Sequence, residues 1–173
     1  VTADAGITLQ IMLHHPDRVW PEEGGAHGAG PEAAARVRLV AFRAAGLALA
    51  RFHSAGVAHG RPSIRDICWD GATARLIDLE RHAPGRAGPR ALATDLMLFL
   101  WSILATIPHE TPELAAAVAG YREAAPPAIW RDAARRARRL RFLGPLTAPL
   151  RRLRPGSTDI VAVPLTLALL RRA

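Results

Sequence analysis

Three acidic residues flank a short segment that has the pattern of a β-hairpin. Asp66 precedes this segment, and Asp78 and Glu80 follow it. Because a hairpin returns the chain to its starting point, its two ends should bring these carboxylates close together. Carboxylate oxygens are the ligands that Mg²⁺ prefers. The sequence therefore predicts a divalent-metal site formed by these three acids. The alternative is that Asp66 caps a turn and Asp78 ends a strand.

Two arginines lie in the loop directly before the first of these acids. Arg61 and Arg65 are separated only by Pro62, Ser63 and Ile64. A guanidinium group binds phosphate oxygens through two parallel hydrogen bonds. Arginines beside a metal-binding carboxylate therefore predict a clamp for the phosphate groups of a nucleotide. The same spacing also allows both arginines to pair with the neighbouring acids.

A long helix and a hairpin are expected to position this loop. The helix is predicted to begin at Pro31, where proline suits a first turn, and to stop before Gly56. Between these limits, apolar residues recur at helical spacing. Two short apolar runs at 67–69 and 74–77 surround the turn pair Asp70-Gly71, and they predict the hairpin.

The remainder of the chain is expected to be mainly helical. Helices are predicted at about 90–105, 111–124, 127–142 and 158–170, with Pro164 interrupting the last of them. Residues 16–31 and 84–89 are rich in proline and glycine and predict loops. The tail contains Gly144, Pro145, Pro149 and Pro155, and no helix is predicted before 158 in this stretch. The predicted fold class is mainly α with one small hairpin. The chain is expected to form a single domain, 1–173, made of a segment with a loop (1–30), a core (31–105) and a helical tail (106–173).

Composition limits the possible chemistry. The net charge is +8, and all 23 basic residues are arginines. Without lysine, the chain cannot supply a Schiff base or a lysine that holds a phosphate. The single cysteine, Cys68, excludes an internal disulfide and predicts core packing rather than a nucleophile. The start of the chain has no signal-peptide pattern, and Asp95 within the apolar run 91–107 favours a buried helix over a membrane span. A cytoplasmic location is therefore expected.

The run LALARFHSAGVAHGRPSIRDICWDGATARLIDLE, from Leu47 to Glu80, resembles the catalytic core of protein-kinase-like folds. It is most similar to bacterial lipopolysaccharide kinases and to small atypical kinases. The opening VTADAGITL is similar to the hinge that leads into their helical lobe, so the resemblance covers about residues 1–105. It implies the helical C-terminal lobe of such a fold, with the N-terminal β lobe missing or nearly so. The chain is accordingly expected to be a fragment.

The resemblance also implies roles for individual residues, together with ATP and Mg²⁺ as cofactors. His59 takes the place of the catalytic-loop histidine and Asp66 that of the metal-binding asparagine. Asp78 takes the place of the second metal-binding residue, an aspartate. Asp95 resembles the aspartate of the central helix that accepts hydrogen bonds from the backbone of the catalytic loop. The implied catalytic set is His59, Arg61, Asp66 and Asp78, with Arg61 and Arg65 contacting nucleotide, Asp66, Asp78 and Glu80 binding metal, and Asp95 supporting the loop.

The sequence departs from the kinase pattern at several positions. Arg61 stands where the catalytic base is an aspartate, and a guanidinium group does not accept a proton at neutral pH. The chain also lacks a glycine-rich phosphate loop and the phosphate-binding lysine. Three functions remain open: an ATP-dependent phosphotransferase, an inactive pseudokinase that acts as a binding or regulatory module, and a metal-dependent nuclease. The acceptor of the phosphotransferase is open between a sugar-lipid, a protein and a small molecule.

An arginine-rich stretch, 131–154, is the strongest electrostatic feature of the sequence. Its arginines recur at helical spacing opposite alanine and leucine positions. The pattern is typical of a solvated helix face, and it also suits contact with an anionic membrane surface. No nucleic-acid motif accompanies it, so nucleic acid is not an expected partner. A peripheral position at the inner membrane is the alternative to a purely cytoplasmic one.

Overall fold

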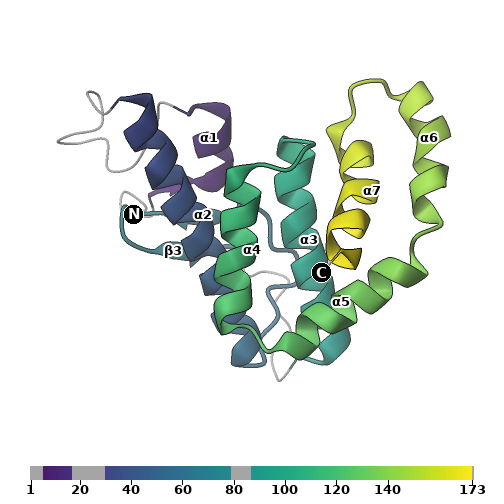
Figure 1. The fold of residues 1–173 in the computed structure, drawn as a ribbon. Coiled ribbons are helices and arrows are strands. Elements are labelled where there is room, and N and C mark those ends of the chain that lie inside the picture. The colour runs from purple at the N-terminus through teal and green to yellow at the C-terminus, as the bar shows by residue number, and fades with distance from the viewer. Residues whose placement is uncertain (1–5, 17–29, 79–86, 173) are drawn as a thin grey trace.

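The computed structural model describes residues 6–16, 30–78 and 87–172. In these ranges the chain forms a small antiparallel sheet and a larger body of helices (Figure 1). The elements are β1 (Ile7–Thr8), α1 (Leu9–His14), α2 (Pro31–Ser54), β2 (Ile67–Trp69), β3 (Ala74–Leu76), α3 (Pro89–Thr106), α4 (Pro112–Ala124), α5 (Pro127–Arg139), α6 (Leu143–Leu153) and α7 (Thr158–Arg171). The predicted mainly-α class with a small β component is confirmed.

The predicted hairpin is present as β2 and β3, with Ile67 opposite Leu76. Its turn is held by Asp70, whose Oδ1 accepts hydrogen bonds from the backbone N–H groups of Ala72 and Thr73 at 3.0 and 2.7 Å. The prediction of a lone hairpin was incomplete, because β1 pairs with the other edge of β2 and makes the sheet three-stranded. A strand of two residues is too short to produce a recognisable alternation in the sequence.

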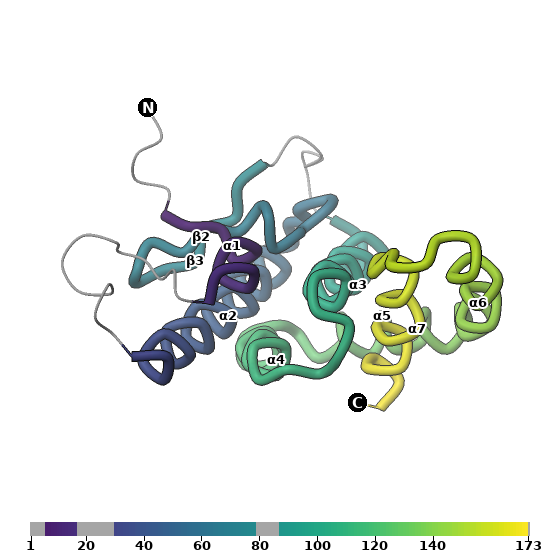
Figure 2. The backbone as a smooth tube through the Cα atoms, turned by 90° about the horizontal axis from the view of Figure 1, so that it is seen from above, coloured from purple at the N-terminus to yellow at the C-terminus, as the bar shows by residue number. Residues whose placement is uncertain are grey.

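The close approach of α2 and α4 organises the helical body. A Cβ atom added at Gly46 of α2 would lie 2.0 Å from the carbonyl oxygen of Ala117. A Cβ atom added at Gly120 of α4 would lie equally close, 2.0 Å, to the carbonyl oxygen of Arg43. Only glycine at both positions therefore lets the two backbones pack at this distance. Figures 1 and 2 show the two helices side by side, with the sheet on the other side of α2.

Helix α3 lies at the centre of the molecule and packs against α5 and α7. Figure 2 shows α6 at the far end of the molecule from the sheet, beyond α7. The core is continuous across these helices and includes the fully buried side chains of Phe42, Leu96, Phe99 and Tyr121. None of the helices in the described part of the chain is both long enough and apolar enough to span a bilayer.

The tail differs most from the sequence prediction. The sequence predicts no helix within 144–155, but most of these residues belong to α6. Pro145 lies in the first turn of this helix, where its missing N–H group breaks no helical hydrogen bond. Pro164 was predicted to interrupt the last helix, but α7 continues through it. Helix α5 ends at Arg139, three residues before the predicted end at 142. Helix α1 was not predicted, since six residues carry too little periodicity. The predicted loops at 16–31 and 84–89 lie mostly outside the described residues.

Candidate functional site

The carboxylate of Asp95, on α3, binds the loop that follows α2. Its Oδ2 accepts a hydrogen bond from the backbone N–H of His59 at 2.5 Å. The backbone N–H of Gly60 donates to Oδ1 at 3.1 Å and to Oδ2 at 3.2 Å. Gly60 has a φ of +95°, a backbone conformation that residues other than glycine rarely adopt. Asp95 is only 2% exposed, although it is an acid in an apolar helix. Its burial is explained by the backbone N–H groups whose hydrogen bonds it accepts.

The ring of His59 joins this loop to the end of the hairpin. Its Nε2 lies 2.9 Å from the carbonyl oxygen of Ile77. Because a carbonyl oxygen only accepts hydrogen bonds, Nε2 must carry the proton in this contact. The ring is buried, and its Nδ1 has no hydrogen-bond partner among the described residues. His59 is therefore held as a brace between the loop and the strand end.

A backbone hydrogen bond of Ile77 links the two ends of the hairpin that carry the predicted metal-binding acids. Its N–H donates to the backbone carbonyl oxygen of Asp66 at 2.8 Å, so Asp78 follows directly after a residue paired with Asp66. Asp78 is exposed and has a φ of +60°, the one positive φ outside glycine in the described part of the chain. The hairpin thus places the backbone of Asp66 next to the residue before Asp78, and the convergence of the two carboxylates stays a prediction. Glu80, the third predicted ligand, lies outside the described residues.

The side chain of Asp66 has an unusual environment. Asp66 is half-buried, and its Oδ2 is inaccessible to solvent without a hydrogen bond to any described residue. A buried carboxylate oxygen without a partner is costly unless a cation or a donor satisfies it. The described residues contain no group of three or more histidines, cysteines or acids that could hold a metal ion. Two carboxylates nevertheless fit Mg²⁺, which is commonly bound by one or two protein carboxylates together with waters and substrate phosphates.

The arginines of the loop are directed to solvent. Arg61 and Arg65 are both exposed, and neither forms an ion pair with a described residue. The alternative in which they pair with Asp66 or Asp78 is therefore not realised, while pairing with Glu80 lies outside the described residues. Both side chains are therefore accessible to an anion from solvent.

Comparison with known proteins identifies no relative. No family model matches this chain, and no curated protein or solved structure matches it. The roles of its residues are therefore inferred from their contacts.

A buried polar group behind Asp95 was not anticipated from the sequence. Nδ1 of His53, on α2, lies 2.7 Å from the hydroxyl of Tyr121, on α4. Nε2 of the same ring lies 3.6 Å from Asp95 Oδ2. Burial, together with the negative charge of Asp95, raises the pKa of the Tyr121 phenol. Asp95 thus binds the loop on one side and faces this pair on the other, which ties the loop to the contact between α2 and α4.

The sequence held only weak signals for this pair. Tyr121 is the single tyrosine of the chain, and His53 falls four residues after Leu49 on the buried face of α2. Neither observation shows that two residues 68 positions apart meet. The prediction that Cys68 packs in the core agrees with its position in β2, where it is 3% exposed. Its burial, and secondarily the negative charge of Asp66, raises the pKa of this thiol and disfavours the nucleophilic thiolate.

Proposed function

We propose that the loop around His59 and the end of the hairpin form a magnesium-dependent nucleotide-phosphate site, and that the chain acts as the helical lobe of a kinase-like, ATP-dependent phosphotransferase. The observation that carries the proposal is the set of hydrogen bonds from the backbones of His59 and Gly60 to Asp95. In the kinase-like resemblance, this is the task of the aspartate in the central helix. The contact between His59 and Ile77 supports the same reading, since it braces the loop against the strand end that leads to Asp78.

The site residues divide the work between binding and positioning. Asp66 and Asp78 would hold Mg²⁺, and the unpartnered Oδ2 of Asp66 fits this role. The ion would neutralise charge on the phosphates. Arg61 and Arg65, which are exposed and precede Asp66 in the same loop, would contact phosphate oxygens. His59 and Asp95 are positioning residues, because their polar atoms bind protein backbone.

Arg61 favours a second candidate function, a nucleotide-binding module without turnover. An arginine cannot take the proton of an acceptor hydroxyl, so no residue at this position acts as a general base. Phosphoryl transfer depends mainly on positioning and on electrostatic stabilisation, which Arg61 supplies as a cation. We favour the phosphotransferase on these grounds, with a sugar-lipid, a protein or a small molecule as the acceptor.

Nucleotide binding tests the magnesium-dependent nucleotide site that both candidate functions require. We expect calorimetry to detect ATP binding that requires Mg²⁺, and expect Asp66→Asn and Asp78→Asn each to weaken it by about tenfold or more. Glu123→Gln is the matched control, because Glu123 is an exposed acid in a surface ion pair with Arg43. Binding that is indifferent to Mg²⁺ or to both aspartate substitutions would refute the site. Release of ADP then separates the two candidates, since a binding module has no turnover for Asp78→Asn to remove.

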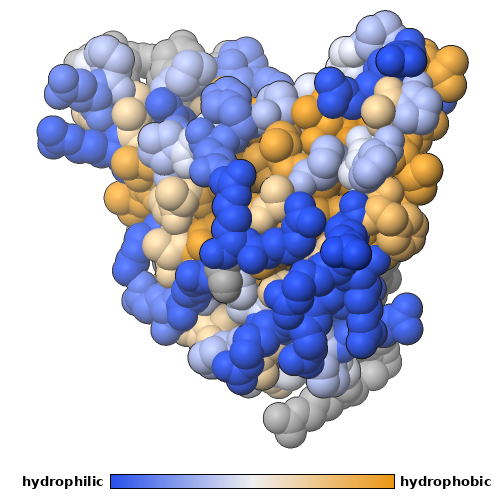
Figure 3. All heavy atoms as spheres, turned by 45° about the vertical axis from the view of Figure 1, so that its right-hand side comes forward, coloured by the Kyte–Doolittle hydropathy of each residue, from blue (hydrophilic) through white to orange (hydrophobic). Residues whose placement is uncertain are grey.

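A peripheral membrane contact is also proposed, through α6 and the arginines around it. Phe142, Leu146, Leu150 and Leu153 recur at helical spacing and are each at least half exposed, which is unusual for large apolar side chains in one stripe. Arginines precede this stripe in sequence, interrupt it near its end and follow it: Arg138, Arg139 and Arg141, then Arg151 and Arg152, and Arg154. Figure 3 shows apolar surface adjoining strongly hydrophilic surface on this side of the molecule. An apolar stripe with flanking cations suits an anionic bilayer.

Vesicle sedimentation tests this contact. We expect the protein to sediment with phosphatidylglycerol vesicles but not with phosphatidylcholine vesicles, and expect Leu146→Glu with Leu150→Glu to abolish sedimentation. Val40→Glu is the control, because Val40 is a 56% exposed apolar residue on α2. Equal loss in this control, or equal binding to both kinds of vesicle, would contradict the proposal.

A further inference from the structure

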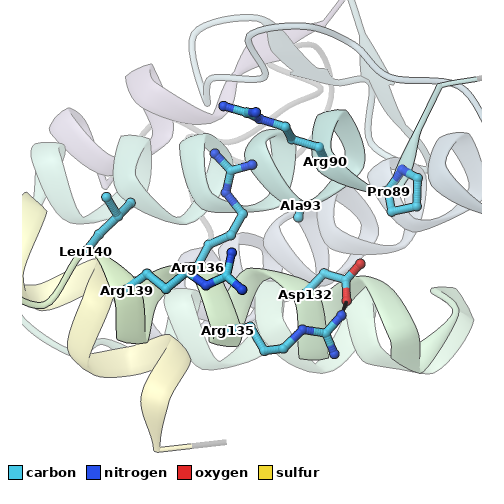
Figure 4. A pocket seen from close by; sticks show the side chains of 8 residues that line it. All are labelled: Pro89, Arg90, Ala93, Asp132, Arg135, Arg136, Arg139 and Leu140. Atoms are coloured by element: carbon cyan, nitrogen blue, oxygen red, sulfur yellow. Dashed lines mark hydrogen bonds and ion pairs between the residues drawn. The ribbon is translucent and has the colours of Figure 1, made fainter.

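A second basic site lies away from the Asp95 loop, in a cleft of about 610 Å³ between the first turns of α3 and the outer face of α5. Its volume is within the range of small-molecule sites. The lining residues come from these two helices and the residue after α5: Pro89, Arg90, Ala93, Asp132, Arg135, Arg136, Arg139 and Leu140. Figure 4 shows them, with side chains from both helices extending into the space between.

The packing of α5 on α3 explains why the arginines gather there. Ile129, Ala133 and Ala137 form the buried face of α5. Asp132, Arg136 and Arg139 follow one another at intervals of four and three residues, so they lie in a row beside that face. Ala93, at the corresponding position of α3, has a side chain small enough to leave the cleft open. The row is therefore fixed by two rigid helices rather than by a loop.

The charges in the cleft are unbalanced. Arg135 is neutralised by an ion pair with Asp132, three residues earlier on the same helix. Arg90, Arg136 and Arg139 have no ion pair with any described residue. In Figure 4 the side chains of Arg136 and Arg139 extend from α5 toward α3, and the side chain of Arg90 runs along α3 at the rim of the cleft. Three cations held this way repel one another, and a bound anion removes that repulsion.

We propose that this cleft binds a ligand that carries two linked phosphate groups. Each guanidinium group binds phosphate oxygens through a planar pair of hydrogen bonds. Three guanidinium groups carry more positive charge than one phosphate group, at about −1.5 to −2, can neutralise. A diphosphate carries about the charge that the three unpaired arginines leave uncompensated. The apolar wall made by Pro89, Ala93 and Leu140 leaves room for an organic group attached to the diphosphate. The diphosphate belongs either to a free metabolite or to the headgroup of an anionic lipid.

Titration with inorganic pyrophosphate in the absence of Mg²⁺ tests the cleft apart from the Asp95 loop. We expect saturable binding that is tighter than that of orthophosphate and weakens as salt is added. Arg136→Ala and Arg139→Ala should each weaken binding by about tenfold, which is the effect of losing one charge-assisted contact. Arg138→Ala is the matched control: it lies in the same last turn of α5, removes the same charge and does not line the cleft.

The outcomes are distinct. Absence of pyrophosphate binding at millimolar concentration, together with no dependence on Arg136 in vesicle binding, overturns the proposal. An equal loss in Arg138→Ala also overturns it, because the attraction would then be general electrostatics. If pyrophosphate fails but phosphatidylcholine vesicles bind only when they contain a diphosphate lipid, and do so in an Arg136-dependent way, the site is a lipid headgroup site. If pyrophosphate binds and a diphosphate lipid in phosphatidylcholine vesicles adds no binding, the ligand is a free diphosphate compound.

Discussion

Replacement of Asp95 is the most direct test of the loop architecture. In Asp95→Ala, the backbone N–H groups of His59 and Gly60 lose a charged acceptor inside the protein. Each buried donor that is left unpaired costs about 1–3 kcal/mol. For two donors, we expect the free energy of unfolding to fall by about 3–5 kcal/mol. A domain of ordinary stability has only about 5–15 kcal/mol in total, so the loss is large but survivable.

Asp95→Asn should cost much less. The amide oxygen can occupy the position of Oδ2, which lies within hydrogen-bond distance of both donors, at 2.5 and 3.2 Å. Only the charge and the contact of Oδ1 with Gly60 are then lost, so we expect a cost of about 1–2 kcal/mol. The order of stability should therefore be wild type, then the asparagine variant, then the alanine variant.

Urea denaturation of the three proteins measures these differences. Thermal midpoints should follow, with about 10 °C lost in Asp95→Ala at 2–4 °C per kcal/mol. Amide hydrogen exchange at His59 and Gly60 should accelerate in both variants beyond the change in global stability. Thr94→Ala serves as the control, since the Thr94 hydroxyl bonds only to the carbonyl of Arg90 in its own helix. An alanine variant as stable as the wild type, or an asparagine variant as unstable as alanine, would refute the reasoning.

Three further predictions concern the packing and the turn. Gly46→Ala and Gly120→Ala should each cost about 3 kcal/mol, although alanine normally stabilises a helix, whereas Gly144→Ala, whose Cβ meets only Pro164 at 3.8 Å, should be neutral or stabilising by about 1 kcal/mol in urea denaturation. Three N–H and O–H donors at Ala72 and Thr73 lower the pKa of Asp70 to about 2. This lowered pKa contributes stability above the ordinary pKa near 3.8, and the contribution disappears as the pH falls through 2. The difference between wild type and Asp70→Asn should accordingly be about 1 kcal/mol at pH 7, after allowance for solvent screening, and vanish near pH 2; a difference that grows on acidification would contradict this. Tyr121→Phe should lose about 1–2 kcal/mol through the missing bond to His53, and no loss would show that this contact is dispensable.

The long-period elements of this fold could be predicted from the sequence. Helix α2 has a regular apolar face and a glycine at its end, and Gly56 has the positive φ of +75° typical of a helix stop. The Asp70-Gly71 turn identified the hairpin. Helix α6 was missed because Pro145 and Pro149 carried more weight than the apolar spacing, and the helix accepts both. Strand β1 could not be found, since it exists only by pairing with β2, about 60 residues later in the sequence.

In the candidate site, too, the relations that are local in sequence could be predicted, and those that depend on tertiary packing could not. Asp66 and Asp78 could be placed together from the hairpin alone, because the relation between them is local. Asp95 was identified by resemblance, and the spacing of residues offered no independent route to it. The meeting of His53 with Tyr121 depends on the packing of α2 against α4, and the arginine cleft depends on that of α5 against α3. Tertiary packing of this kind leaves no local signal in a single sequence.

The glycine contact between α2 and α4 has a consequence for how the chain folds. Residues at this contact are far apart in the sequence: Arg43 and Glu123, which pair across it, are separated by 80 positions. The loop, strands β2 and β3, and α3 lie in the intervening chain, so the contact forms only after a long segment has been closed. Folding should therefore be slow for a mainly helical protein of this size. On the ribosome, α2 should remain without its partner until synthesis has passed α4, and this interval is where the nascent chain most needs protection from aggregation.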